Sequence, residues 1–304
     1  ILAYPESANS AILGSIGAAP SLEGAPNYNA KVDWITRVLN DYVLENVKPD
    51  VIYCWLTEPD HTQHGAGIGA PRTLETVRNS DRAIGSLIEK LKQNGLFEKS
   101  NIFIASDHGF STYEYNVNVA GALVDAGLKE SPDSDDVVLA SSGQSVLLHV
   151  KDRNPSKIKN ITEFLLKQDW CGVLFTAGIG PAPQNVKGIV DGTFSLELIH
   201  MPSDGRGPDI VLTFPWSSRK NEFGYSGTDY SSSSRSTAPR SGLGSGHGSM
   251  SPWTIRNTMI AWGVDIKSGV KSRVPACSID MTATILSLDD VELDKYVQGR
   301  VLSE

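Results

Sequence analysis

Three short clusters of carboxylate and imidazole side chains are the parts of this sequence best suited to chemistry. They are residues 58–65 with Asp60 and His64, then Ser106-Asp107-His108-Gly109-Phe110, then Gly246-His247-Gly248. Side chains four apart project from one face of a helix, so Asp60 and His64 would form half of a divalent-metal site if their turn is helical. Carboxylates combined with neutral imidazoles suit zinc. We therefore predict metal ligands at Asp60, His64, Asp107, His108 and His247.

Each cluster also has a plainer interpretation. An Asp-His pair after a strand is often a helix cap beside a hydrogen-bonded histidine, and a histidine between glycines is compatible with a flexible surface linker. The occurrence of all three clusters together favours the metal site. Of the remaining histidines, His61 has no partner at ligand spacing, His149 falls in a strand pattern and His200 lies among apolar residues. All three are interpreted as structural or surface residues.

The elements that must position these clusters follow from hydrophobic patterning. The apolar run 51–56 and the run 101–105 each read as a buried strand, and the apolar positions between 74 and 91 recur at helical spacing before Asn94-Gly95. Strand, helix and strand in this order predict a βαβ unit and a parallel sheet. Loops that follow the carboxyl ends of parallel strands converge on one crevice, which would bring the first two clusters together.

The rest of the chain divides into a core and an insertion. We expect helices at 33–47 and 279–288 and a strand at 258–262 in the core, which comprises residues 1–112 and 241–304. Residues 113–240 are expected to form an inserted α+β cap, with strands at 146–150 and 209–214 and a helix at 158–167. Residues 217–251 are rich in serine and glycine, and this composition predicts a long loop.

Composition narrows the class of protein. The 304 residues carry 27 Lys and Arg against 35 Asp and Glu, a formal net charge of −8, and this acidic balance disfavours a stable nucleic-acid complex. No apolar run approaches the ~20 residues of a membrane span. Three well-separated cysteines indicate neither a disulfide framework nor a cysteine-based zinc site, and Cys54 in its apolar run is expected to be buried.

The start at Ile1-Leu2-Ala3-Tyr4 has no initiator methionine and no helix or strand start signal, so we expect the chain to begin inside a domain.

The three clusters, in this order and spacing, resemble the metal-binding motifs of the type I phosphodiesterase/nucleotide pyrophosphatase family of the alkaline phosphatase superfamily. The resemblance implies an α/β, alkaline-phosphatase-like three-layer sandwich with a mostly parallel central sheet and an inserted cap. It also implies two neighbouring zinc ions. One would be held by Asp60, His64 and His247, and the other by Asp107 and His108 together with a further Asp and a nucleophilic Thr or Ser.

The chain departs from the family pattern at its beginning. No Asp precedes Asp33 and no Thr precedes Thr36, and none of the early serines stands in the family's nucleophile context. We therefore expect the nucleophile and one metal ligand upstream of Ile1, in an N-terminal segment that would complete the site. A diverged, inactive metal-binding relative is the alternative.

The implied reaction is hydrolysis of a phosphodiester or nucleotide pyrophosphate bond in a small-molecule substrate, through a covalent Thr or Ser phospho-enzyme intermediate. Two divalent ions would stabilise both the attacking and the leaving oxygen at phosphorus. A phosphomonoester or a phosphonate is the alternative substrate. The resemblance also implies a periplasmic or secreted location, while the sequence leaves the compartment open.

Substrate contacts are less defined by the sequence. Trp55 either stacks on a nucleobase, as an aromatic residue does at the matching position of nucleotide-cleaving relatives, or packs in the core. Phe110 and Tyr113 are candidate rim aromatics. Cations in or near the loops leading to His247 either contact an anionic substrate or are solvated loop charges; they are Arg206, Arg219, Lys220, Arg235 and Arg240.

Overall fold

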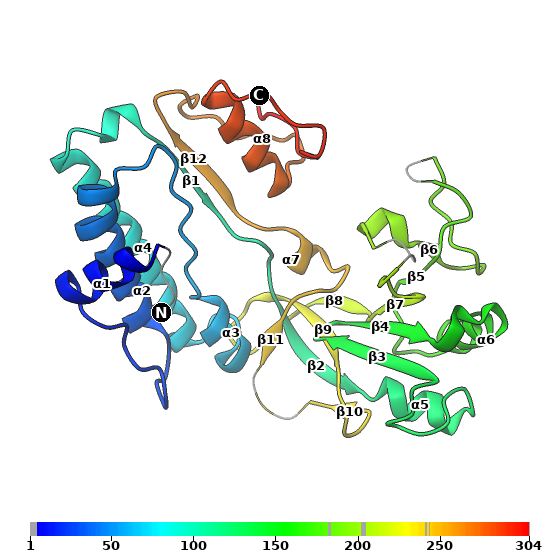
Figure 1. The fold of residues 1–304 in the computed structure, drawn as a ribbon. Coiled ribbons are helices and arrows are strands. Elements are labelled where there is room, and N and C mark those ends of the chain that lie inside the picture. The colour runs from blue at the N-terminus through cyan, green and yellow to red at the C-terminus, as the bar shows by residue number, and fades with distance from the viewer. Residues whose placement is uncertain (1–4, 182–183, 202–204, 241, 243, 304) are drawn as a thin grey trace. The chain divides into compact units, whose positions relative to one another are not determined.

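The computed structural model describes residues 5–181, 184–201, 205–240, 242 and 244–303 (Figure 1). The expectation about the start at Ile1-Leu2-Ala3-Tyr4 falls outside these residues. Contacts within the chain group it into two compact units. The first comprises residues 1–62, 70–107 and 257–304, and the second comprises residues 63–69 and 108–256.

Helices make up most of the first unit. They are α1 (Glu6–Ser15), α2 (Asn29–Arg37) with a π-helical continuation (Val38–Val47), α4 (Pro71–Gln93), a 3-10 turn (Phe97–Lys99) and α8 (Ile279–Leu288). The predicted helices at 33–47, 74–91 and 279–288 are confirmed, and the first begins earlier, at Asn29. Pro71 occupies the first turn of α4, and Gly95, just past its end, has a φ of 66° that few other residues adopt.

The sheet of the first unit differs from the predicted one. β1 (Asn101–Ala105) and β12 (Met259–Gly263) are the predicted strands, but they pair with each other, antiparallel. The predicted strand at 51–56 is wrong: in the described structure this run is in no sheet, Tyr53 is 76% exposed, and Cys54 is exposed rather than buried. Its apolar composition matched a buried strand, but a strand also needs a neighbour to receive its backbone hydrogen bonds.

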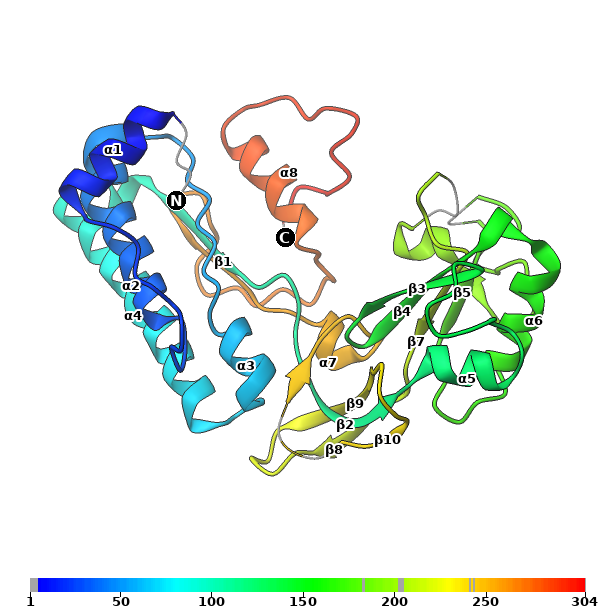
Figure 2. The same ribbon diagram turned by 60° about the horizontal axis from the view of Figure 1, so that its bottom comes forward.

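A five-stranded sheet in the second unit holds the main hydrophobic core. Its order is β3-β4-β7-β5-β6, antiparallel except for the β5–β6 pair. Helices α5 and α6 lie beside this sheet (Figure 2). Their apolar side chains, among them Leu123, Ile161 and Leu165, pack in one hydrophobic cluster with strand residues such as Leu148 and Leu212. The bounds are β3 (Val137–Ser142), β4 (Ser145–Val150), β5 (Leu174–Thr176), β6 (Phe194–Ser195), β7 (Ile210–Thr213), α5 (Val119–Asp125) and α6 (Pro155–Leu165). The predicted strands at 146–150 and 209–214 and the helix at 158–167 are confirmed. The 3-10 turns Lys151–Arg153 and Leu196–Ile199 complete this part.

A second sheet of this unit carries the serine-rich part of the chain. Its order is β10-β2-β9-β8, with β11 also paired to β2. The bounds are β2 (Ser111–Val117), β8 (Trp216–Lys220), β9 (Ser226–Ser232), β10 (Ala238–Pro239) and β11 (Ser245–Gly246). The prediction of one long loop over 217–251 is therefore wrong, although positions 241 and 243 lie outside the described residues. Serine and glycine offer little apolar surface, but their backbones still form ladders when a neighbouring strand such as β2 supplies partners.

The chain thus has an α/β fold with mixed sheets. Parallel pairing occurs between β2 and β9 and between β5 and β6, and the other strand pairs of the described residues are antiparallel. The short helix α3 (Asp60–Ala66) contains two of the predicted metal ligands, and the short helix α7 (Pro252–Ile255) follows His247 in the sequence. Among the described helices, none has the length and apolar character required to cross a membrane.

Candidate metal centre

Helix α3 confirms the helical turn expected for Asp60 and His64, and the buried carboxylate of Glu58 fixes its start. Glu58 is 3% exposed, and it accepts hydrogen bonds from the backbone N–H groups of Tyr28 and Thr62, at 2.6 and 3.1 Å. The hydroxyl of Thr62 donates a third, at 2.8 Å. A carboxylate at this end of a helix satisfies backbone N–H groups and opposes the helix dipole. Glu58 therefore orients the turn that carries Asp60.

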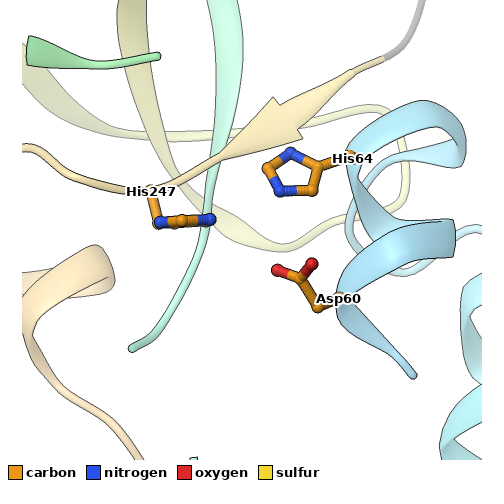
Figure 3. A group of neighbouring side chains, drawn as sticks. All are labelled: Asp60, His64 and His247. Carbon is orange, nitrogen blue, oxygen red and sulfur yellow. The ribbon is translucent and has the colours of Figure 1, made fainter. Parts of the chain in front are cut away.

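Asp60, His64 and His247 come together in the structure. Each offers one ligand atom, and these atoms all lie within 4.8 Å of one another. Figure 3 shows the carboxylate of Asp60 and the ring of His64, both from α3, facing the ring of His247, which follows β11. Two imidazoles and a carboxylate are three ligands of the kind that zinc takes in catalytic sites, so these residues fit the metal.

The imidazole of His64 is oriented by the backbone of β11. Its Nδ1 lies 3.0 Å from the carbonyl oxygen of Ser245, and the hydroxyl of Ser245 donates to the carbonyl of Gln63 at 2.6 Å. A carbonyl oxygen only accepts, so Nδ1 of His64 donates in this contact, and Nε2 is the nitrogen that we expect to bind a metal. Ser245 is buried and pairs with Thr112 of β2. Strand β11 thus holds α3 as well as His247.

The glycines beside His247 have separate structural reasons. A Cβ on Gly246 would overlap the phenol of Tyr113, and Gly248 has a φ of 97°, which L side chains rarely adopt. The Gly-His-Gly cluster is therefore a close approach of β11 to β2 followed by a left-handed turn. A flexible linker would require neither feature.

His108 joins the other histidines through its ring. It stacks on His247 with centroids 3.4 Å apart and planes 14° apart. Its Nδ1 lies 3.0 Å from the carbonyl oxygen of Gly109. The ring of Phe110 contacts three histidines, with centroid distances of 5.1 Å to His64 and 5.3 Å to both His108 and His247. Phe110, expected at the rim, is a common packing surface for the imidazoles.

Asp107 is placed differently from the other predicted ligands. It is exposed at the end of the segment that follows β1, where the side chain of Asn257 donates to the carbonyl oxygen of Ser106 at 2.6 Å. Within the described part of the chain, Asp107 and His108 belong to no second group of three metal-ligating side chains. The second metal site therefore stays a prediction.

The three remaining histidines occupy other places. His61 stacks on Tyr28, with centroids 3.5 Å apart. His149 lies in β4 opposite Val138, and His200 is exposed with a left-handed φ of 54°. Trp55 is 53% exposed and tilts toward Tyr53 at 6.2 Å, which argues against the core alternative and leaves its face accessible.

The candidate cations near His247 differ in their surroundings. Arg219 forms an ion pair with Glu114, and the guanidinium of Arg240 lies 4.9 Å from the ring centroid of Tyr113. Both arginines line a cavity of about 480 Å³ on the serine-rich sheet, beside Glu114 and Glu222. Arg206, Lys220 and Arg235 are exposed. The cavity has balanced charge, so the arginines in it do not create a positive anion site.

Sequence reasoning missed the parts played by Glu58 and Ser245. A weak signal for Glu58 was available, because an acidic residue beside the first turn of a helix is favoured by the helix dipole. The signal for Ser245 was not, since its partners Gln63 and His64 are remote in sequence and the contact depends on the pairing of β11 with β2.

Comparison with protein families connects this geometry to known proteins. The model of the type I phosphodiesterase/nucleotide pyrophosphatase family matches residues 7–169. Human ectonucleotide pyrophosphatase/phosphodiesterase family member 7 is 35% identical over 104 residues, which are 33% of this chain and 22% of that protein. Bis(5'-adenosyl)-triphosphatase ENPP4 of Pongo abelii is 37% identical over 89 residues, 28% of this chain and 20% of that protein.

A solved structure shares the fold. It is an inactive variant of murine ectonucleotide pyrophosphatase/phosphodiesterase 5 in complex with AMP, with a TM-score of 0.57 and 15% sequence identity. The match covers 88% of this chain and 60% of the murine chain. The chain therefore spans less than two thirds of the length of the proteins it matches.

Proposed function

Because the chain belongs to the type I phosphodiesterase/nucleotide pyrophosphatase family, we propose that the complete protein is a metal-dependent hydrolase of phosphodiester or nucleotide pyrophosphate bonds. The observation that carries the proposal is the group of Asp60, His64 and His247, whose ligand atoms lie within 4.8 Å of one another. The names of two similar proteins add support for nucleotide substrates, since one is a bis(5'-adenosyl)-triphosphatase and another was solved with AMP.

In this proposal Asp60, His64 and His247 hold one zinc ion. Asp107 and His108, with an Asp and a Thr or Ser nucleophile upstream of Ile1, hold the other. When bound, the two ions supply Lewis-acid stabilisation of the charge that develops on the phosphoryl oxygens. The nucleophile hydroxyl gives up its proton and attacks phosphorus, and the bond from phosphorus to the leaving alcohol or phosphate oxygen breaks, which leaves a covalent phospho-enzyme. Water then attacks phosphorus, the bond to the nucleophile oxygen breaks, and that oxygen takes up a proton to regenerate the hydroxyl.

The residues around the ligands have supporting roles in the proposal. Glu58 sets the direction of α3, and the carbonyl of Ser245 keeps the hydrogen of His64 on Nδ1. The half-exposed face of Trp55 is available to stack on a nucleobase, and base–aromatic stacking contributes about 1–3 kcal/mol per base.

We also propose the larger organisation of the complete protein. Residues 1–112 and 241–304 belong to a catalytic core of the alkaline-phosphatase type, a three-layer sandwich with a mostly parallel sheet, and residues 113–240 form its inserted cap. The fold likeness to the murine structure over 88% of this chain supports the assignment.

Zinc content tests the metal site directly. Zinc bound to the purified protein is measured by elemental analysis for wild type, His247→Ala, Asp60→Asn and the control His61→Ala. His61 lies on the same helix as Asp60 and His64, but its ring stacks on Tyr28, so its removal should leave zinc unchanged. We expect loss of zinc in the first two variants only. Wild-type zinc content in His247→Ala would refute the site.

Substrate preference tests the reaction. The complete protein is assayed on bis(p-nitrophenyl) phosphate and on p-nitrophenyl phosphate, and we expect the diester to be preferred. A preference for the monoester by about tenfold, about 1.4 kcal/mol of transition-state discrimination, would favour the phosphomonoesterase alternative. No turnover of either substrate by protein that retains zinc would favour an inactive metal-binding relative.

A further inference from the structure

One buried carboxylate lies between two of the histidine-bearing segments without being a predicted ligand. Asp229, in the middle of β9, is 1% exposed. Its Oδ2 accepts a hydrogen bond from the hydroxyl of Ser249 at 2.6 Å and a longer one from the hydroxyl of Ser111 at 3.4 Å. Its Oδ1 accepts from the backbone N–H of Tyr230 at 2.9 Å. The Asp229 carboxylate thus contacts Ser111, three residues after His108, and Ser249, two residues after His247.

The hydroxyl of Ser249 extends this contact along the segment after His247. It lies 3.0 Å from the hydroxyl of Thr254 and accepts a hydrogen bond from the N–H of Ser251, also at 3.0 Å. The carbonyl of Thr254 in turn accepts from the N–H of Gly109 at 2.8 Å. All three hydroxyl-bearing residues, Ser249, Ser251 and Thr254, are buried.

The hydroxyl of Ser111 extends the contact in the other direction. Ser111 is fully buried at the start of β2, and it accepts a hydrogen bond from the side-chain amide of Gln144, which is also fully buried. In the ladders Asp229 lies opposite Tyr113 of β2 and Trp216 of β8. The hydrogen-bond partners of the carboxylate are therefore uncharged, two hydroxyls and a backbone N–H.

Burial of a charged carboxylate at this position has a large desolvation cost. Burial raises the pKa of Asp229 to about 7, although the hydrogen bonds from Ser249, Tyr230 and Ser111 act in the opposite direction. A hydrogen-bonded hydroxyl or amide in the same place would carry a smaller desolvation cost. What an acidic oxygen adds is a strong acceptor that binds two hydroxyl donors at once.

We propose that Asp229 is a positioning residue that holds the segments carrying His108 and His247 in the arrangement required for metal binding. The inference rests on the proposed function, because it concerns the metal site. Asp229 acts through Ser111 and Ser249, and these serines fix where His108 and His247 leave the sheet. Groups that hydrogen-bond a metal ligand directly typically change metal affinity by about 10–100-fold when they are lost, and Asp229 acts one contact further out, so we expect an effect at the lower end of this range.

Zinc affinity of the full chain, measured by competition with a chelating dye, tests the proposal. Asp229→Ala removes the acceptor and should weaken zinc binding about tenfold. Asp229→Asn keeps an acceptor oxygen for the serines and should restore most of the affinity. The matched control is Ser231→Ala, two positions along β9, whose buried hydroxyl donates to Asn116 instead. It should bind zinc as the wild type does.

The outcomes separate this proposal from the proposed function. Wild-type protein that binds no zinc would overturn both. Two outcomes would overturn the positioning role alone, provided that the wild type binds zinc. One is an unchanged zinc affinity in folded Asp229→Ala. The other is a loss of affinity in Ser231→Ala equal to that in Asp229→Ala. If Asp229→Ala does not fold, Ser249→Ala removes only the 2.6 Å contact. Its zinc affinity should fall severalfold, and an unchanged affinity would overturn the proposal.

Discussion

The imidazole of His108 stacks on that of His247, with centroids 3.4 Å apart and ring planes 14° apart. The two residues come from clusters that lie far apart in the sequence, and a direct contact between them is the strongest link between the second cluster and the third. The stack therefore links the two clusters through their side chains.

Phe110 supports this stack from its edge, so its removal should weaken metal binding. Phe110→Ala leaves a gap beside His64, His108 and His247, and we expect zinc affinity to fall about tenfold, as for other groups that contact ligands. Phe110→Leu fills most of the gap and should bind zinc more tightly than the alanine variant. Chelator competition measures both. Equal affinity of all three proteins would show that the ring does not organise the histidines.

The sequence predicted the helices well because helix formation depends on local spacing. The stripe from Leu74 to Leu91 defines α4, and four-residue spacing places Asp60 beside His64 on α3. Strand pairing was predicted less well because it depends on partners remote in sequence. Nothing local indicated that β1 pairs with β12, or that residues 51–56 are in no sheet of the described structure.

The serine-rich segment shows the same limit. Composition suggested a loop for residues 217–251, yet β9 and β11 both pair with β2 there. Asp229 was overlooked for this reason, since an aspartate among serines looks like a solvated loop residue until the ladder buries it. Patterns of apolar residues do not reveal strands whose side chains are mostly hydroxyls.

Loss of the charge on Glu58 should destabilise the start of α3. Glu58→Gln keeps the side-chain shape but replaces a carboxylate that accepts from Tyr28 and Thr62. Hydrogen bonds to a charged group contribute about 1.5–3 kcal/mol each, so we expect a loss of about 1–3 kcal/mol in the free energy of unfolding. Urea denaturation measures it. Glu75→Gln, at an exposed position of α4, is the control and should change the midpoint little. Equal midpoints for both variants would contradict the capping role.

Asp229 should make stability depend on pH in an identifiable direction. Its pKa in the folded chain is raised from the ordinary 3.8 to about 7. As pH rises, the Asp229 carboxyl loses its proton at a lower pH in the unfolded chain than in the folded chain. The free energy of unfolding therefore falls between about pH 4 and about pH 7, by about 4 kcal/mol in all. Asp229→Asn cannot ionise, and its stability relative to wild type should rise over the same interval. Unfolding free energies at several pH values test this. Asp135→Asn, which alters an exposed carboxylate, should follow the wild-type curve. Parallel curves for wild type and Asp229→Asn would contradict the raised pKa.

Gly109, between His108 and Phe110, should tolerate no side chain. A Cβ there would overlap the carbonyl oxygens of Trp253 and Arg256, which belong to the backbone around α7 and cannot rotate away as a flexible side chain would. We expect Gly109→Ala to lower the unfolding free energy by about 1–3 kcal/mol, as overpacking does, and to lower zinc affinity because His108 must move.

Gly85→Ala is the matched control. It lies inside α4 with nothing within 4 Å of the added Cβ, so it should raise stability by about 0.5–1 kcal/mol through helix propensity. Thermal or urea unfolding distinguishes the expected loss of stability in Gly109→Ala from the expected gain in Gly85→Ala. Unchanged stability of Gly109→Ala would contradict close packing of the backbone around α7 against the His108 segment.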